Sequence, residues 1–385
     1  MSGGQVSSES SPATLARQLT EAGHLTPSWR GTFTQVDRKR FIPDRIWIRG
    51  EGGYHPINRA TDPDRWNALV YDDRALVTQV EDDSDTGTAL VPSSSASMPR
   101  VVATMLDALD LADGMTVLEA GTGTGYNAAL LAARLGDRHV VSVEMDPRLA
   151  DTARERLKGA GFAPTVITGD GAQGCPARAP YDRVIATYAL HTVPYPLVEQ
   201  TAPGGVIVLP WGTGLYNGVL LRLTVGEDGT AGGPVIGDSA FMWNRHEAPE
   251  RDVMATVRKQ AQPRATATAT RTGLDPRNVF GDENAAFTAG ALVPDCRYTV
   301  GHGPDGEFTL WLADHATGSW ASVDHVPDAT EFDTHQHGPR RLWSEVESAY
   351  DRWESAGSPE RTRYGLTVTP TGQYVWLDTP GTPVP

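Results

Sequence analysis

The sequence predicts an α/β fold in which a parallel-rich, doubly wound sheet is followed by a C-terminal α+β extension. Short apolar runs alternate with amphipathic segments between Ser97 and about Val225. Such alternation is typical of parallel strands joined by helices that cover both faces of the sheet. After about Gly226 the alternation gives way to strand-like pieces with one helix candidate, so we place a second region there.

The predicted elements of the regular region follow one another along the chain. Apolar residues at helical spacing predict a first helix, through Val101, Val102, Met105, Leu106 and Leu109. A short buried run at 116–120 (TVLEA) then predicts a strand that ends at glycines. The remaining predicted elements are a helix over 128–135, a strand over 139–143, a helix over 148–157, and strands over 165–168 and 183–187.

The chain divides into four predicted regions. Residues 1–12 are small and polar, a composition that cannot bury surface and predicts a disordered tail. An N-terminal cap region over 13–95, the regular region over 96–225 and the extension over 226–385 follow. Within the extension we expect a linker or exposed loop at 261–272 (AQPRATATATRT), strands at 308–312 and 366–369, and a helix at 340–353.

Composition argues against several kinds of partner. The formal net charge of −15 over 385 residues disfavours nucleic acid or an anionic membrane as a partner. No apolar stretch reaches the length of a membrane span, so we expect a cytoplasmic protein. No metal site is predicted, because Cys175 and Cys296 have no His or Cys at ligand spacing and the pair His335 and His337 lacks a third ligand.

The strongest local signal is a glycine-rich turn between a predicted strand and a predicted helix, at 117–126 (VLEAGTGTGY). Its glycines allow close approach of the backbone to a ligand, and the following helix offers free N–H groups. A dinucleotide-binding turn and a plain tight turn contain the same pattern, so the turn alone leaves these alternatives open. A P-loop is disfavoured, because no Gly-Lys-Ser/Thr sequence follows.

Two acids at the ends of the next predicted strands sharpen this prediction. Glu144 stands where a carboxylate can accept hydrogen bonds from both ribose hydroxyls. Asp170 can accept from an adenine amino group, beside Gly171, which leaves room for the ring. Each acid alone is more often a solvated loop carboxylate. Together they predict a pocket for a nucleoside without phosphates, and adenosine attached to methionine fits that description.

These motifs resemble those of the protein-L-isoaspartate O-methyltransferase family. The matching pieces are 117–131 (VLEAGTGTGYNAALL), 169–174 (GDGAQG), 177–182 (ARAPYD) and 200–212 (QTAPGGVIVLPWG), with 38–44 (RKRFIPD) and 71–74 (YDDR) nearer the N-terminus. The resemblance covers roughly residues 30–225 and implies a Rossmann-like class I methyltransferase whose 96–225 region binds S-adenosyl-L-methionine. The implied cofactor-binding residues are Glu119, Gly121, Thr122, Gly123, Gly125, Tyr126, Glu144, Met145, Asp170, Gly171 and Thr187.

The resemblance also implies an acceptor site. In the family a serine before a helix lies near the acceptor carboxylate, and the matching piece is 97–105 (SMPRVVATM), so Ser97 is the implied catalytic residue. An N-cap for the helix that Pro99 begins is an equally open interpretation of Ser97. Because Ser97 ends a serine-rich run, the register is open by a residue or two, and Ser95 is a second substrate-binding candidate. His191 is either a substrate contact or a structural histidine.

The expected chemistry needs no general base. An aspartyl carboxylate, with an ordinary pKa of about 3.9, is ionised at neutral pH. In-line methyl transfer to it therefore requires orientation and removal of water rather than deprotonation. The methyl ester so formed is open to attack by the next backbone nitrogen, which closes a succinimide.

The extension carries a second, less specific resemblance. The pieces 337–343 (HGPRRLW) and 364–367 (YGLT) resemble the long branch of the family associated with ribosomally made peptides such as graspetides and lanthipeptides. This implies that the acceptor is an aspartate in a modified precursor peptide and that the product passes to aspartimide. Repair of isoaspartate in proteins is the alternative, and a non-catalytic nucleoside-binding module or a dinucleotide oxidoreductase would be a function of another class. The tryptophans and arginines of the extension suit either a peptide-binding surface or its own core.

Overall fold

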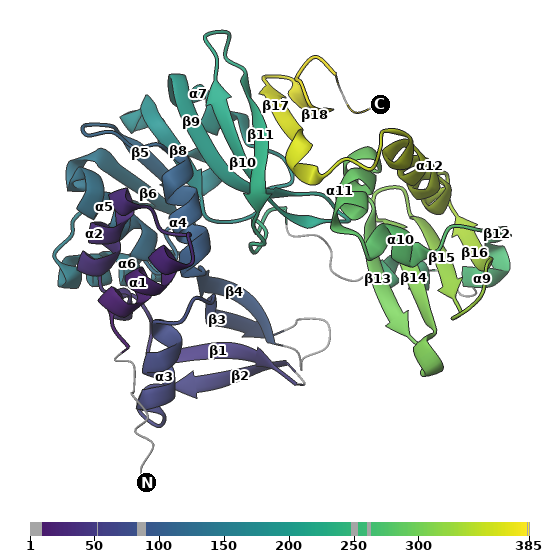
Figure 1. Cartoon of the computed structure of the whole chain (residues 1–385), viewed down its shortest axis with the longest axis horizontal. Helices are drawn as coiled ribbons and strands as arrows, with labels where there is room; N and C mark the ends of the chain where they lie inside the picture. Colours follow the sequence, from purple (N-terminus) through teal and green to yellow (C-terminus); the bar gives the residue numbers. More distant parts are fainter. Residues whose placement is uncertain are drawn as a thin grey trace.

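The described part of the chain is organised around three β-sheets. The computed structural model describes residues 10–51, 53–82, 90–247, 253–259, 263–382 and 384. A nine-stranded sheet occupies the centre, and a four-stranded N-terminal sheet and a five-stranded C-terminal sheet lie apart from each other beside it (Figure 1). Within these ranges, no helix combines the length and the apolar character that crossing a bilayer requires.

The N-terminal region forms helices and a small antiparallel sheet. Its helices are α1 (Pro12–Glu21), α2 (Pro27–Gln35) and α3 (Pro63–Val70), each with a proline in the first turn, where the missing N–H has no intrahelical partner to lose. Its strands are β1 (Arg45–Gly50), β2 (Gly53–Asn58), β3 (Leu76–Asp82) and β4 (Leu90–Ala96), in the order β2-β1-β3-β4. Trp66 of α3 packs with Ile46 and Leu76 in the core of this sheet.

The predicted disordered tail extends too far. Ser11 caps α1, because its hydroxyl accepts a hydrogen bond from the N–H of Thr14 (3.2 Å), and Pro12 is the first residue of the helix. Small polar residues suit a helix N-cap as well as a tail, so composition alone does not separate the two. Residues 1–9 lie outside the described residues.

The central sheet has a parallel half and an antiparallel half. Its strands are β5 (Val117–Ala120), β6 (Val140–Glu144), β7 (Thr165–Thr168), β8 (Tyr181–Ala186), β9 (Thr201–Gly212), β10 (Asn217–Val225), β11 (Ala231–Asp238), β17 (Tyr364–Thr369) and β18 (Gly372–Leu377). They lie in the order β18-β17-β11-β10-β9-β8-β5-β6-β7. All pairs from β9 to β7 are parallel, and all pairs from β9 to β18 are antiparallel. The predicted doubly wound sheet is confirmed, and its parallel strands make up one half.

Apolar residues alternate between the two faces of the parallel strands. Val117 of β5 packs into one core and Leu118 into the other, as expected for a strand buried on both sides. The first core is completed by residues of α1, α2, α4 (Pro99–Ala108), α5 (Tyr126–Leu135) and α6 (Pro147–Ala160), and the second by α7 (Tyr195–Glu199). Short 3-10 helices lie at Arg38–Arg40, Asp137–His139, Gly171–Gln173, Pro176–Arg178, Pro304–Gly306 and Arg361–Arg363.

The central sheet continues beyond residue 225, where the sequence analysis places its end. β11 pairs with β10, and β17 returns from near the end of the chain to pair with β11. β11 contains several glycines, so it shows no regular spacing of apolar residues that would predict a strand. A Cβ on Gly233 would lie 2.0 Å from the carbonyl oxygen of Arg222, so no side chain fits at that position. The extension is therefore partly a continuation of the central sheet.

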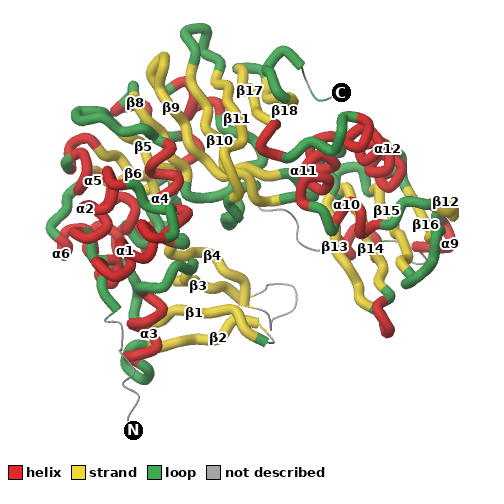
Figure 2. Tube along the Cα trace, in the orientation of Figure 1, coloured by secondary structure: helices red, strands yellow, loops and turns green. Residues whose placement is uncertain are grey.

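Within the extension, residues 253–259 and 263–355 form a unit that we call the C-terminal module (Figure 2). Its elements are α8 (Val253–Arg258), α9 (Pro263–Thr266), β12 (Thr268–Thr272), α10 (Pro276–Phe280), α11 (Glu283–Leu292), β13 (Arg297–His302), β14 (Phe308–Asp314), β15 (Ser319–His325), β16 (Phe332–His337) and α12 (Leu342–Ser355). Its antiparallel sheet has the order β12-β16-β15-β14-β13. Residues 261 and 262 of the predicted linker 261–272 lie outside the described residues. For the remainder the prediction of a linker is wrong, because β12 pairs with β16 and its threonines suit a strand.

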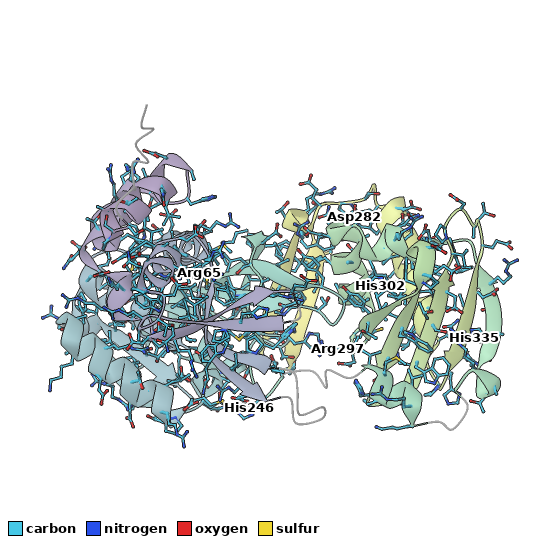
Figure 3. The ribbon with its side chains drawn as sticks, turned by 90° about the horizontal axis from the view of Figure 1, so that it is seen from below. Arg65, His246, Asp282, Arg297, His302 and His335 are labelled. Atoms are coloured by element: carbon cyan, nitrogen blue, oxygen red, sulfur yellow. The ribbon has the colours of Figure 1, made fainter. Side chains whose placement is uncertain are left out.

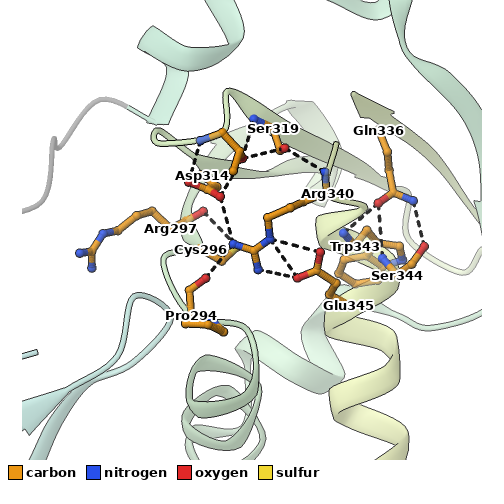
Figure 4. A network of polar contacts seen from close by, with 11 residues as sticks. Pro294, Cys296, Arg297, Asp314, Ser319, Gln336, Arg340, Trp343, Ser344 and Glu345 are labelled. Atoms are coloured by element: carbon orange, nitrogen blue, oxygen red, sulfur yellow. Dashed lines mark hydrogen bonds and ion pairs between the residues drawn. The ribbon is translucent and has the colours of Figure 1, made fainter. Parts of the chain in front are cut away.

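The piece HGPRRLW builds the core of the C-terminal module. Trp343 is buried beside Val346 in that core. Arg340 forms ion pairs with Asp314 of β14 (3.1 Å) and with Glu345 of α12, and donates to the carbonyl oxygen of Pro294 (Figure 4). Trp343 and Arg340 therefore stabilise the C-terminal module itself.

The turn between β9 and β10 fixes the C-terminal module to the central sheet. Leu215 of this turn is buried in the core of the module. A Cβ on Gly214 would lie 2.0 Å from the carbonyl oxygen of Cys296, and a Cβ on Gly290 of α11 would lie 1.9 Å from the hydroxyl of Thr213. Such close backbone contact sets the position of the residues that begin β13.

Candidate active site

A cleft opens at the carboxyl ends of the parallel strands, where ligands bind in open α/β sheets. Its volume is about 1120 Å³, including space open to solvent. Three parts of the chain line it: the end of β4 with the residues that follow (93–97), the loops after β5 to β8, and the segment 241–245 after β11. The sequence analysis predicts the second part well, the first in part, and the third not at all.

The glycine-rich turn forms one wall of the cleft. Gly121 has a φ of +98°, and a Cβ there would lie 2.4 Å from the hydroxyl of Thr187. That hydroxyl donates to the carbonyl oxygen of Gly121 (2.5 Å), so Thr187 holds the turn from the end of β8. Thr122 and Tyr126, which the sequence analysis also assigns to the cofactor, line the same cleft.

Glu144 at the end of β6 faces the turn. One carboxylate oxygen accepts from the N–H of Gly123 (2.8 Å), and the other accepts from the N–H of Asp146 (3.0 Å). Each oxygen keeps a further lone pair for a ligand donor. Met145, another predicted cofactor residue, lines the cleft next to it.

Asp170 follows β7 and lies on the same cleft. One of its oxygens accepts from the N–H of Ala172 (2.9 Å), and the other lies 3.7 Å from Nε2 of His246. A Cβ on Gly171 would lie 2.8 Å from the hydroxyl of Tyr188, so only glycine leaves this space clear. The structure thus brings the glycine turn, Glu144 and Asp170 to one cavity.

Two predicted cofactor residues lie outside the wall of the cleft. Glu119 is fully buried under the turn, where its carboxyl accepts from Asn127 Nδ2 (2.7 Å) and Ser142 Oγ (2.5 Å). Burial raises the pKa of Glu119 to about 7, against the opposing effect of these two hydrogen bonds. Gly125 faces Ala153 of α6, because a Cβ there would lie 3.4 Å from the Ala153 side chain. Both residues support the turn from behind.

Ser95, in β4, and Ser97, just after it, also line the cleft. The interpretation of Ser97 as a helix cap is wrong, because the N-cap of α4 is Met98 and no side chain caps that helix. Buried Arg38 donates to the carbonyl oxygen of Ser97 (3.0 Å) and also to the carbonyls of three residues, Val70, Asp72 and Arg74. The motifs RKRFIPD and YDDR therefore meet to position Ser97.

His191 does not line the cleft. Its backbone N–H donates to the carboxylate of Glu247 (2.9 Å), and its ring Nδ1 lies 3.0 Å from the carbonyl oxygen of Gly212. Its ring meets the ring of Trp243 edge to face, with centroids 6.2 Å apart. His191 is a structural histidine that supports a residue of the cleft wall.

The segment 241–245 is the part of the site that the sequence analysis misses. It pairs with the chain just after β8: the N–H of Ala189 donates to Met242 (2.7 Å), and the N–H of Asn244 donates to Ala189 (2.8 Å). Arg245 reaches the carbonyl oxygen of Ser93 (3.4 Å) and lies 3.8 Å from Asp146. No motif marks this segment, and only its aromatic content (FMW) after a glycine-rich stretch is a sequence signal.

Tyr188 is a second residue that the sequence analysis misses. It follows Thr187 at the end of β8 and lines the cleft. Its hydroxyl is buried and has no hydrogen-bond partner in the part of the chain that the structure describes. Burial raises the pKa of Tyr188, so its hydroxyl stays protonated at neutral pH and is available as a donor.

The side chains that line the cleft fit a nucleoside joined to an amino acid better than a nucleotide phosphate. Glu144 and Asp170 would repel a phosphate, and Arg245 is the only Lys or Arg among the described lining residues. The same acids can accept from ribose hydroxyls and an adenine amino group, with the Tyr188 hydroxyl as an added donor. Glu144, Asp170 and the turn Gly121–Gly123 would hold S-adenosylmethionine.

The fold is that of class I S-adenosylmethionine-dependent methyltransferases. A family model described as protein-L-isoaspartate(D-aspartate) O-methyltransferase matches residues 57–234. The chain belongs to this family: it is 38% identical over 168 residues to the protein-L-isoaspartate O-methyltransferase of Methanothrix thermoacetophila and 43% identical over 141 residues to that of Methanococcoides burtonii. It covers 73% and 70% of those proteins, which correspond to 43% and 36% of its own length.

Other relatives are matched over shorter shares of their length. The chain is 43% identical over 160 residues to the protein of the same name from Hyperthermus butylicus, and it spans 61% of that protein with 39% of its own length. A solved protein-L-isoaspartate O-methyltransferase structure superposes with a TM-score of 0.54 at 21% identity, over 96% of this chain and all of the other. That similarity includes the extension and concerns the fold.

Proposed function

We propose that the chain transfers a methyl group from S-adenosylmethionine to an aspartyl-type carboxylate in a peptide or protein. The observation that carries this proposal is a single cleft lined both by Gly121, Glu144 and Asp170 and by Ser97. The first three suit the cofactor, and Ser97 offers a hydroxyl to an acceptor. Family membership supports the same reaction.

The side chains of the cleft have to orient the acceptor rather than deprotonate it. The bound cofactor supplies a methyl group on a cationic sulfonium, which passes to a carboxylate oxygen and leaves a neutral thioether. The acceptor carboxylate needs no base, because it is ionised at neutral pH. Ser97 donates a hydrogen bond to it, and the carboxylates of Glu144 and Asp170 keep it on the far side of the cleft by repulsion. Trp243 and the β4 segment exclude water there.

The proposal extends to an aspartate of a ribosomally made peptide precursor, with aspartimide as the end product. Repair of isoaspartate needs access to many unrelated proteins, whereas a dedicated precursor calls for a further recognition surface. The C-terminal module supplies such a surface beside the cleft, where Arg297 of β13 lies over the ring of Trp243 (5.8 Å). We assign substrate recognition to the extension on this basis.

Mass spectrometry of peptides incubated with enzyme and S-adenosylmethionine tests both levels of the proposal. Matched linear aspartyl, cyclised aspartyl and isoaspartyl peptides are compared. The aspartyl peptides should gain a methyl group and then lose methanol as the succinimide closes. Methylation of the isoaspartyl peptide alone would instead support repair. Binding of S-adenosylhomocysteine without transfer to any peptide would indicate a binding module.

Ser97→Ala provides the matching site test. Loss of one hydrogen bond to a charged acceptor should lower kcat/KM by about 10-fold or more and leave the affinity for S-adenosylhomocysteine unchanged. Ser348→Ala, on the exposed face of α12, is the control. Equal activity of the two variants would remove Ser97 from the acceptor site.

A further inference from the structure

The side chain of Trp243 is held between the central sheet and the C-terminal module. On one side it lies against Gly212, because a Cβ on Gly212 would be 2.9 Å from the indole ring. On the other side the guanidinium of Arg297 lies 5.8 Å from the ring centroid, within the range of a cation–π contact. Through Arg297 the module contacts a residue of the cleft wall.

The ring of Trp243 lies away from the strands that carry the two acids assigned to the cofactor. The cofactor acids Glu144 and Asp170 follow β6 and β7, at one edge of the sheet. The ring of Trp243 lies beside Gly212, the last residue of β9, which is three strands away from β6. With about 4.8 Å between neighbouring strands, the two positions are separated by roughly 14 Å along the sheet. A change at Trp243 should therefore affect the acceptor more than the adenosyl group.

The position of Arg297 is set by the module. It is the first residue of β13, directly after Cys296, whose carbonyl group packs against Gly214. Its side chain points away from the Arg340 network and toward the central sheet (Figures 3 and 4). Burial lowers the pKa of Arg297, but a guanidinium remains charged at neutral pH.

We propose that Arg297 is a positioning residue that holds the Trp243 ring in the cleft wall, so that the C-terminal module sets the fit of the peptide acceptor. This inference rests on the proposed methyl transfer. Arg297 acts through Trp243 and does not line the cleft itself. A single cation–π contact contributes only modestly to a free energy, so its loss should weaken peptide binding without abolishing methyl transfer.

Kinetics of the full-length enzyme test this role. Arg297→Ala should raise the KM for the peptide acceptor by about 2- to 30-fold, the range expected for loss of a cation–π contact, with kcat little changed. Arg297→Lys keeps the charge and should restore most of the affinity. In a double-mutant cycle, Arg297→Ala should add no further loss to Trp243→Leu, because the two changes remove one contact.

Arg264→Ala is the matched control. Arg264 makes the same kind of contact, 5.5 Å from the ring centroid of Trp311, inside the C-terminal module and away from the cleft. If Arg264→Ala raises the KM as much as Arg297→Ala does, the effect is general to the module and the inference fails. Additive losses in the cycle would also overturn it, because Arg297 would then act on the peptide directly.

A spectroscopic readout separates this inference from the proposed reaction. The protein is labelled with 5-fluorotryptophan, and the fluorine resonance of Trp243 is assigned with Trp243→Phe among the 10 tryptophans. Arg297→Ala should shift or broaden that resonance, and Arg264→Ala should leave it in place. An unchanged resonance overturns the positioning role whether or not a peptide is methylated. A changed resonance with unchanged KM overturns the link to the acceptor.

Discussion

The two halves of the central sheet contribute different parts of the site. The parallel half holds the glycine turn, Glu144 and Asp170, all within one contiguous stretch of about 50 residues after β5 begins. The antiparallel half contributes the segment 241–245 after β11, and the end of β4 lines the same cleft. Arg297 of the C-terminal module lies outside the cleft and contacts Trp243 of that segment. The proposed cofactor pocket is thus built by local sequence, whereas the proposed acceptor pocket is assembled from distant parts of the chain.

The largest expected effect tests the parallel half. Gly121→Ala places a methyl group 2.4 Å from the Thr187 hydroxyl at a φ of +98°. Strain and collision together should weaken binding of S-adenosylhomocysteine by about 100-fold, or about 3 kcal/mol, in calorimetry. Gly159→Ala in α6, where nothing lies within 4 Å of the added methyl group, should bind normally. Normal binding by Gly121→Ala would break the assignment of the cofactor to this half.

The second prediction concerns the buried acid under the turn. The pKa of Glu119 is raised from 4.5 to about 7, so its protonated form stabilises the fold below about pH 4.5, and this contribution is lost as the pH rises through about 7. Glu119→Gln is neutral at every pH. It should match the wild type at pH 4.5 and exceed its free energy of unfolding by up to about 3 kcal/mol at pH 8.

Chemical unfolding at a series of pH values measures this difference. Glu199→Gln, at an exposed position at the end of α7, is the control and should follow the wild type throughout. If Glu119→Gln keeps the pH dependence of the wild type, the raised pKa of Glu119 is wrong.

The contrast between the halves also explains how much of the fold could be predicted. The strand predicted at 165–168 is β7 without change, and the strand predicted at 183–187 is β8 to within two residues. Both strands are short and contain β-branched residues (Val166 and Ile167; Val184 and Ile185), a local signal that a short window can detect. β11 carries glycines where backbones touch, and its partner β17 lies more than 120 residues further along the chain. No local pattern encodes that pairing.

The same reasoning applies to the site. The glycine turn, Glu144 and Asp170 share a cavity, as their places at strand ends predict. Glu119 and Gly125 belong to the same motif but support it from behind. Glu119 is buried in β5 under the turn, and Gly125 packs against Ala153 of α6. Trp243 and Arg297 carry no motif at all, since their meeting depends on how the C-terminal module packs against the turn between β9 and β10.

A third prediction sharpens the role of the β6 carboxylate. Both oxygens of Glu144 accept backbone N–H groups, so Glu144→Gln turns an amide NH2 toward one of these donors. The mismatch and the lost charge should weaken S-adenosylhomocysteine binding by about 30-fold, or about 2 kcal/mol, with the peptide KM little changed. Glu155→Gln on the exposed face of α6 serves as the control. A rise in the peptide KM alone would move Glu144 to the acceptor half.

The smallest expected effect concerns Tyr188, which follows β8 in the parallel half. Its hydroxyl is buried without a partner among the described residues, so Tyr188→Phe should leave the fold as stable as before or slightly more stable. If the hydroxyl donates to the bound nucleoside, the same change weakens S-adenosylhomocysteine binding by about 5-fold, or about 1 kcal/mol.

Tyr181→Phe is the opposite case, because the Tyr181 hydroxyl donates to the carbonyl oxygen of Cys175 (2.9 Å). It should lower stability and leave affinity unchanged. A higher peptide KM with unchanged cofactor affinity in Tyr188→Phe would instead place this hydroxyl on the acceptor side.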